Sequence, residues 1–86
     1  MATAPSGTVT FLFTDIEGST KRWEAFPGAM REAVLRHDRL MRAAIEAADG
    51  HVFKTVGDAF CAVFATPIGA VSAAIAAQRA LLEEDW

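Results

Sequence analysis

The sequence predicts an α+β fold whose elements follow one another in the order β-α-α-β-β-α. Three observations predict it: a β-branched and aromatic run at residues 8–14, two more β-rich runs at 51–56 and 59–64, and helical patterns at 19–48 and 67–84. A strand, a helical crossover, a hairpin and a second helix make up the ferredoxin-like plan. That plan requires one more strand, so we expect an incomplete sheet, either in a fragment or with its edge supplied by a partner chain.

Length and composition indicate one small domain. The chain has 86 residues, of which 52% are apolar and 22% charged. We expect residues 1–7 to be a flexible lead-in and residues 8–86 to form the domain. The net charge of −3 does not point to a nucleic-acid partner or an anionic membrane. With one cysteine and an apolar run at 9–13 that is too short for a signal peptide or membrane span, we expect a cytoplasmic protein.

The first strand and the helices carry local signals. The run at 8–14 has an apolar centre, which predicts a strand covered on both faces. Ser19 or Thr20 can cap a short helix that continues through Trp23, and residues 26–28 break it before a long helix at 29–48. Gly50 suits the left-handed position after that helix. The long helix has an apolar stripe (Val34, Met41, Ala44, Ile45, Ala48) and a charged side expected to face solvent (Arg31, Glu32, Arg36, Arg39, Arg42, Glu46).

The second half of the chain predicts a hairpin and a helix. Gly57 and Asp58 separate the two β-rich runs, which is typical of a hairpin turn. Thr66 is the expected N-cap of the last helix, with Pro67 at its first position. His37 falls within the apolar stripe of the long helix, and we interpret it as a packed or surface-bridging histidine rather than a ligand.

The strand order predicts where a site could lie. In the ferredoxin-like plan the third strand lies between the first two, so Asp15 after the first strand and Asp58 in the hairpin share one sheet edge. Two close carboxylates repel unless a cation lies between them, and Mg²⁺ prefers one or two carboxylates with phosphate oxygens and water. The alternative is that Asp15 only caps a helix and Asp58 only occupies a turn. Spacing alone leaves both interpretations open.

Two further features are compatible with a nucleotide. Gly18 permits close backbone approach, and the N–H groups of residues 17–20 lie at a predicted helix N-terminus, which suits an anion. Alternation places Lys54 on the same strand face as Val52 and Val56. Lys54 is then either an edge or snorkelling residue or a ligand to a buried acceptor.

Two segments resemble the class III adenylate and guanylate cyclases. They are Val9-Thr-Phe-Leu-Phe-Thr-Asp-Ile-Glu-Gly-Ser-Thr20 and Phe53-Lys-Thr-Val-Gly-Asp-Ala-Phe60. The family's first metal motif is an apolar strand ending in Asp-Ile-x-Gly, and its second is Lys or Glu followed by Thr-x-Gly-Asp. Both motifs occur in the family's order and near its usual separation. The likeness covers nearly the whole chain after residue 7 but only about the first half of a cyclase domain.

The resemblance implies roles for the site residues. Asp15 and Asp58 would bind two Mg²⁺ or Mn²⁺ ions, with the Ile16 carbonyl as a further metal ligand. Lys54 matches the purine-reading position, where lysine is typical of ATP users because it can donate to adenine N1. The main-chain N–H groups of Glu17, Gly18, Ser19 and Thr20 would hold the phosphates. Ser19 stands where many members have phenylalanine.

The implied reaction is attack of the ribose 3′-oxygen on the α-phosphorus of ATP, giving 3′,5′-cyclic AMP and pyrophosphate by two-metal catalysis at a dimer interface. The family's second purine-reading residue and its transition-state asparagine and arginine have no counterpart within residues 1–86, so we expect the isolated chain to be inactive. A homodimer or pairing with a second cyclase domain is expected. The alternatives are a non-catalytic cyclase-like regulatory or dimerisation module of a signalling protein, and an unrelated ferredoxin-like binding domain.

Overall fold

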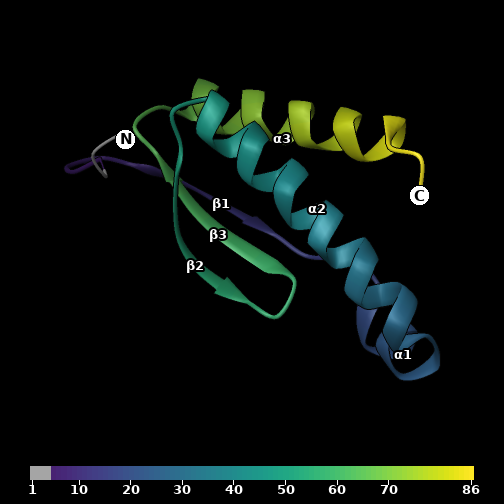
Figure 1. Cartoon of the computed structure of the whole chain (residues 1–86). Coiled ribbons are helices and arrows are strands. Elements are labelled where there is room, and N and C mark those ends of the chain that lie inside the picture. Colours follow the sequence, from purple (N-terminus) through teal and green to yellow (C-terminus); the bar gives the residue numbers. More distant parts are fainter. Residues whose placement is uncertain (1–4) are drawn as a thin grey trace.

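A computed structural model describes residues 5–86 and has the predicted element order (Figure 1). The predicted lead-in lies partly outside the described residues, and the division at residue 7 stays a prediction. No helix in residues 5–86 is long and apolar enough to cross a membrane. The elements are β1 (Thr10–Thr14), α1 (Ser19–Ala25), α2 (Pro27–Ala47), β2 (His51–Val56), β3 (Ala59–Phe64) and α3 (Pro67–Glu83).

The three strands form one sheet in the order β1-β3-β2. β3 is antiparallel to both neighbours, so β1 and β2 run parallel to each other, as the ferredoxin-like plan predicted. The long helices α2 and α3 pack against each other and against the strands, and Figure 1 shows both on one side of the sheet. This arrangement confirms the predicted fold class.

The core lies between the helices and the covered face of the sheet. Ile45, Phe60 and Phe64 are its largest fully buried side chains. Small residues let α3 approach closely, because alanine adds little volume between a helix and its neighbours. The core residues are Met41, Ile45, Phe60, Ala62, Phe64, Ala70, Ala73 and Ala77.

The other face of the sheet is open, so the prediction that the first strand is covered on both faces is wrong. Phe11 is 54% exposed and Phe13 is 66% exposed, whereas Leu12 packs against the core. Because both long helices lie on one side, alternate residues of β1 must lie on the side without a cover. Phe11 contacts Phe13 and Phe53, with ring centroids 6.0 and 5.9 Å apart. We call Phe11, Phe13, Phe53 and Val56 the open-face patch.

Three predictions about helix ends need correction. α1 has Gly18 as its N-cap, at φ 68°, and no side chain caps it, so the predicted cap at Ser19 or Thr20 is wrong. α2 begins at Pro27, not at residue 29, because proline fits the first helical position. The left-handed residue after α2 is Asp49, at φ 62°, and not Gly50.

Gly50 has a different role from the one predicted. A Cβ placed there would lie 2.6 Å from Phe64 Cζ and 2.7 Å from Ile45 Cγ2. The position is buried, and an added side chain would overlap Phe64 and Ile45, so glycine is strongly favoured there. By contrast, the predicted cap of α3 is confirmed: the Thr66 hydroxyl accepts a hydrogen bond from the Gly69 N–H at 3.1 Å.

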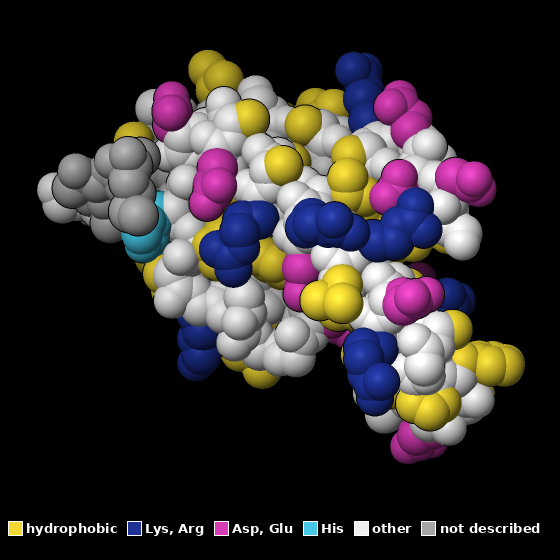
Figure 2. Space-filling view, in the orientation of Figure 1, with side chains coloured by type: hydrophobic (Ala, Val, Ile, Leu, Met, Phe, Trp, Pro, Cys, Tyr) yellow, Lys and Arg dark blue, Asp and Glu magenta, His cyan; other side chains and the backbone are white. Residues whose placement is uncertain are grey.

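The long helix α2 is amphipathic, as predicted. Met41 and Ile45 of the stripe are buried, and His37 beside them is a packed histidine, only 6% exposed. Figure 2 shows basic side chains gathered along the outward side of α2. Arg36 of α2 is half-buried because it reaches the C-terminal segment, where it pairs with Glu84 at 3.1 Å.

Candidate metal and nucleotide site

Asp15 and Asp58 lie at the same end of the sheet, as the strand order predicted. The last paired residues of β1 and β3 are Thr14 and Phe60, so Asp15 leaves β1 where the β2–β3 turn enters β3. The Thr14 hydroxyl also accepts a hydrogen bond from the Phe60 N–H at 3.2 Å, which fixes this end of the pair. Both carboxylates line one cavity of about 420 Å³, which we call the edge cavity; its other lining residues are Ser19, Thr20, Trp23, Val34, Val56 and Gly57.

The two carboxylates differ in their surroundings. Asp15 is exposed, whereas Asp58 is only 8% exposed. Asp58 Oδ1 accepts a hydrogen bond from the Ile16 N–H at 3.4 Å, which is long for such a bond. Within residues 5–86 Asp58 has no ion-pair partner. Because no fully buried side-chain oxygen lacks a hydrogen-bond partner in residues 5–86, the second Asp58 oxygen is accessible from the edge cavity, where a cation could bind it.

The carboxylates of Asp15 and Asp58 suit a hard divalent cation. Its remaining coordination positions would be filled by groups from outside this chain. Residues 5–86 contain no group of three or more His, Cys, Asp or Glu side chains that could hold a metal. Mg²⁺ is commonly held by one or two carboxylates together with substrate phosphates and water. The residues present therefore fit a magnesium- or manganese-nucleotide better than a closed structural metal site.

The loop between β1 and α1 is a tight turn. The Ser19 N–H donates to the Ile16 carbonyl at 3.3 Å, and the Arg22 N–H donates to the Gly18 carbonyl at 3.3 Å. The Ser19 N–H therefore already has a partner within the turn. The Ile16 carbonyl keeps a second lone pair for a metal ion. The phosphate-binding role of residues 17–20 stays a prediction.

Lys54 lies on the open face of the sheet; it shares this face with Val56, as predicted, but the prediction that it also shares a face with Val52 is wrong. Val52 pairs with Ala62, but Lys54 pairs with Cys61, because the register shifts between them at Phe53. This β-bulge puts Lys54 on the face opposite to Val52. Lys54 is exposed. Its ammonium group is therefore accessible on the side of the sheet that no helix covers.

Sequence reasoning missed three residues that shape the edge cavity. Thr14 joins the ends of β1 and β3, while Trp23 and Val34 form cavity wall from α1 and α2. A threonine directly before the aspartate was a usable signal, because its hydroxyl can bond a neighbouring strand. Trp23 and Val34 gave no such signal, since an apolar helix residue is equally suited to a core.

An α+β fold that brings two carboxylates together at one end of its sheet is compatible with a site for a metal-bound nucleotide. The family model of the adenylate and guanylate cyclase catalytic domain matches residues 1–83. The chain belongs to this family.

Individual relatives agree with this assignment. The chain is 44% identical over 82 residues to an adenylate cyclase of Lachancea kluyveri and to a receptor-type adenylate cyclase, GRESAG 4.3, of Trypanosoma brucei brucei. Each alignment covers 95% of this chain but only 4% and 7% of those proteins.

Solved structures show the same architecture. A structure from a study of Trypanosoma brucei adenylate cyclases in their monomeric state superposes with a TM-score of 0.88 at 42% identity. The match covers 91% of this chain and 33% of that one. A second structure from the same organism gives the same TM-score at 44% identity. The fold is thus that of part of a cyclase catalytic domain, and the chain spans a small part of the length of its relatives.

Proposed function

We propose that this chain is the metal-binding part of an adenylate cyclase catalytic site. The proposed reaction converts ATP to 3′,5′-cyclic AMP and pyrophosphate. The observation that carries the proposal is the buried, unpaired carboxylate of Asp58, which shares the edge cavity with the exposed carboxylate of Asp15. Relatives named adenylate cyclases favour this reading over a non-catalytic regulatory module.

The residues of the edge cavity would act by holding and orienting the nucleotide. Asp15, Asp58 and the Ile16 carbonyl would be the metal ligands. When bound, two Mg²⁺ or Mn²⁺ ions would lower the pKa of the ribose 3′-hydroxyl and neutralise triphosphate charge. Free main-chain N–H groups of the 17–20 loop would donate to phosphate oxygens. No side-chain nucleophile is needed, because the attacking oxygen belongs to the substrate.

Lys54 would distinguish ATP from GTP. Its exposed ammonium on the open face is free to donate to adenine N1, which is an acceptor, whereas guanine presents a donor at N1. The site would be completed by a second copy of the chain or by a second cyclase domain, in the cytoplasm. By itself the chain would bind metal-nucleotide weakly and turn over no ATP.

The test measures Mn²⁺–ATP binding to the chain by isothermal titration calorimetry. We expect Asp58→Asn and Asp15→Asn each to weaken binding by about tenfold or more, because each removes a charged ligand. Asp49→Asn is the matched control, since Asp49 is exposed and asparagine tolerates its positive φ. The control should bind like the wild type, and ATP should compete better than GTP.

The free energy of unfolding of Asp58→Asn distinguishes a metal-binding role of Asp58 from a structural one. Asparagine at position 58 can still accept from the Ile16 N–H, while the buried charge is removed. Without metal, Asp58→Asn should therefore match or exceed the wild type in free energy of unfolding. Unchanged Mn²⁺–ATP binding with a stability loss of about 1 kcal/mol or more would make Asp58 a turn residue and overturn the proposal.

A further inference from the structure

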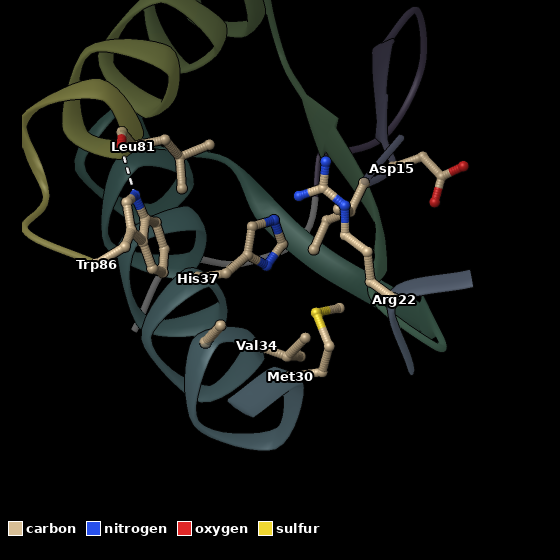
Figure 3. A pocket seen from close by; sticks show the side chains of 9 residues that line it. Asp15, Arg22, Met30, Val34, His37, Leu81 and Trp86 are labelled. Atoms are coloured by element: carbon tan, nitrogen blue, oxygen red, sulfur yellow. Dashed lines mark hydrogen bonds between the residues drawn. The ribbon is translucent and has the colours of Figure 1, made fainter. Parts of the chain in front are cut away.

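A second cavity lies among the helices and adjoins the edge cavity, with which it shares Asp15 and Val34. It has a volume of about 440 Å³, which falls within the range of small-molecule sites. α1 and α2 form one side of it and the end of α3 forms the other (Figure 3). We call it the helix cavity; its lining residues are Asp15, Ile16, Arg22, Met30, Ala33, Val34, His37, Leu81 and Trp86.

The walls of the helix cavity are mostly apolar and carry few polar groups. Met30, Val34, Leu81 and Trp86 supply aliphatic and aromatic surface (Figure 3). In Figure 3 the Asp15 carboxylate points away from the other labelled side chains. A ligand with an apolar body therefore suits this space.

Arg22 and His37 are the basic side chains that line the helix cavity. Arg22, from the last turn of α1, makes no ion pair with any residue between 5 and 86. His37 Nδ1 is engaged with Asp38 Oδ1 at 3.0 Å, which leaves Nε2 as its one ring nitrogen for a ligand. An arginine without a partner beside an apolar wall favours a carboxylate, because guanidinium and carboxylate form paired hydrogen bonds.

The wall at the end of α3 is held in place before any ligand binds. The Trp86 indole N–H donates to the Leu81 carbonyl at 3.0 Å, and Arg36 lies over the Trp86 ring at 5.5 Å. Arg36 also donates to Glu84 and to the Asp85 carbonyl, at 3.1 and 2.7 Å. A wall fixed in this way loses little conformational entropy on binding.

We propose that the helix cavity binds a small apolar carboxylate, with the carboxylate on Arg22 and the apolar body between α2 and the end of α3. Binding does not depend on cyclase activity. Asp15 lines both this cavity and the edge cavity, so the test is made without divalent cations.

The experiment titrates the 86-residue chain with indole-3-acetate and with its neutral analogue indole-3-acetamide, followed by amide and indole NMR signals. We expect shifts at Trp86 and Val34, and about tenfold tighter binding of the acetate, because only the acetate gains a charge-assisted pair. Arg22→Gln should remove the preference for the acetate. Arg39→Gln, at an exposed position of α2 outside the cavity, should keep it.

A variant that fills the helix cavity gives an independent test of binding there. Ala33→Phe should abolish binding of both compounds while the NMR signals of the core stay dispersed. Equal affinity for acetate and amide would overturn the proposal, as would an Arg22→Gln variant that still prefers the acetate. Shifts confined to the open-face patch would overturn it as well, because the compounds would then bind another surface.

Discussion

The two faces of the sheet use similar side chains in opposite ways. On the covered face Phe60 and Phe64 are 2% and 1% exposed and pack under α2 and α3. On the open face Phe11 and Phe13 stack on each other and remain more than half exposed. Hydrophobic stabilisation follows the area removed from water, so the covered face supplies most of the stability of this chain.

This difference separates the residues that stabilise the fold from the residues of the proposed site. An 86-residue chain has a thin stability margin, and one covered face must supply nearly all of it. The open face also carries Lys54, while the edge cavity lies where β1 ends and the β2–β3 turn begins. Substitutions on the covered face should therefore unfold the chain, and substitutions of the exposed side chains on the open face should leave it folded.

The largest expected effect is that of Phe64→Ala. Truncating a fully buried phenylalanine removes its transfer free energy and leaves a cavity, which costs about 3–5 kcal/mol. Since small domains have only 5–15 kcal/mol in total, we expect most of this variant to unfold near 37 °C. Urea denaturation followed by circular dichroism measures the loss. A loss below about 1 kcal/mol would show that the covered face does not dominate stability.

The next effect compares two glycines. Gly50→Ala should lower the free energy of unfolding by about 1–3 kcal/mol, because the added methyl group overlaps Phe64 and Ile45. Gly28→Ala is the control: no atom lies within 4 Å of its added Cβ, and it lies in α2, where alanine is favoured. The control should gain about 0.5 kcal/mol. Thermal melts should show a lower melting temperature for Gly50→Ala and a higher one for Gly28→Ala than for the wild type. A change in the same direction for both variants would contradict the packing argument.

Much of the fold could be predicted because its signals are local. The hairpin has Gly57 and Asp58 between two β-rich runs, and Thr66 with Pro67 marks the start of α3. The handedness of crossovers then places Asp15 and Asp58 at one sheet edge without any side-chain information. The site's position follows from topology, whereas the metal and nucleotide roles stay predictions that rest on family membership and on the surroundings of Asp58.

The features that could not be predicted depend on contacts between distant residues. The bulge at Phe53 reverses the face of Lys54, and a strict alternation along β2 cannot reveal it. Gly50 is required by the ring of Phe64, fourteen positions further along the chain, and not by its own φ. The open face was missed because an apolar strand has the same composition whether one or both of its faces are covered.

The smallest expected effect on stability is that of Phe13→Ala, which makes the same chemical change as Phe64→Ala on the opposite face of the sheet. Phe13 is 66% exposed, so its truncation should cost less than about 1 kcal/mol. Its removal shrinks the open-face patch, and an exposed apolar patch promotes association. Analytical ultracentrifugation should therefore show less self-association than in the wild type. If Phe13→Ala unfolds the chain as Phe64→Ala does, the open face contributes to stability as much as the covered face. That result would contradict the conclusion that the covered face supplies most of the stability.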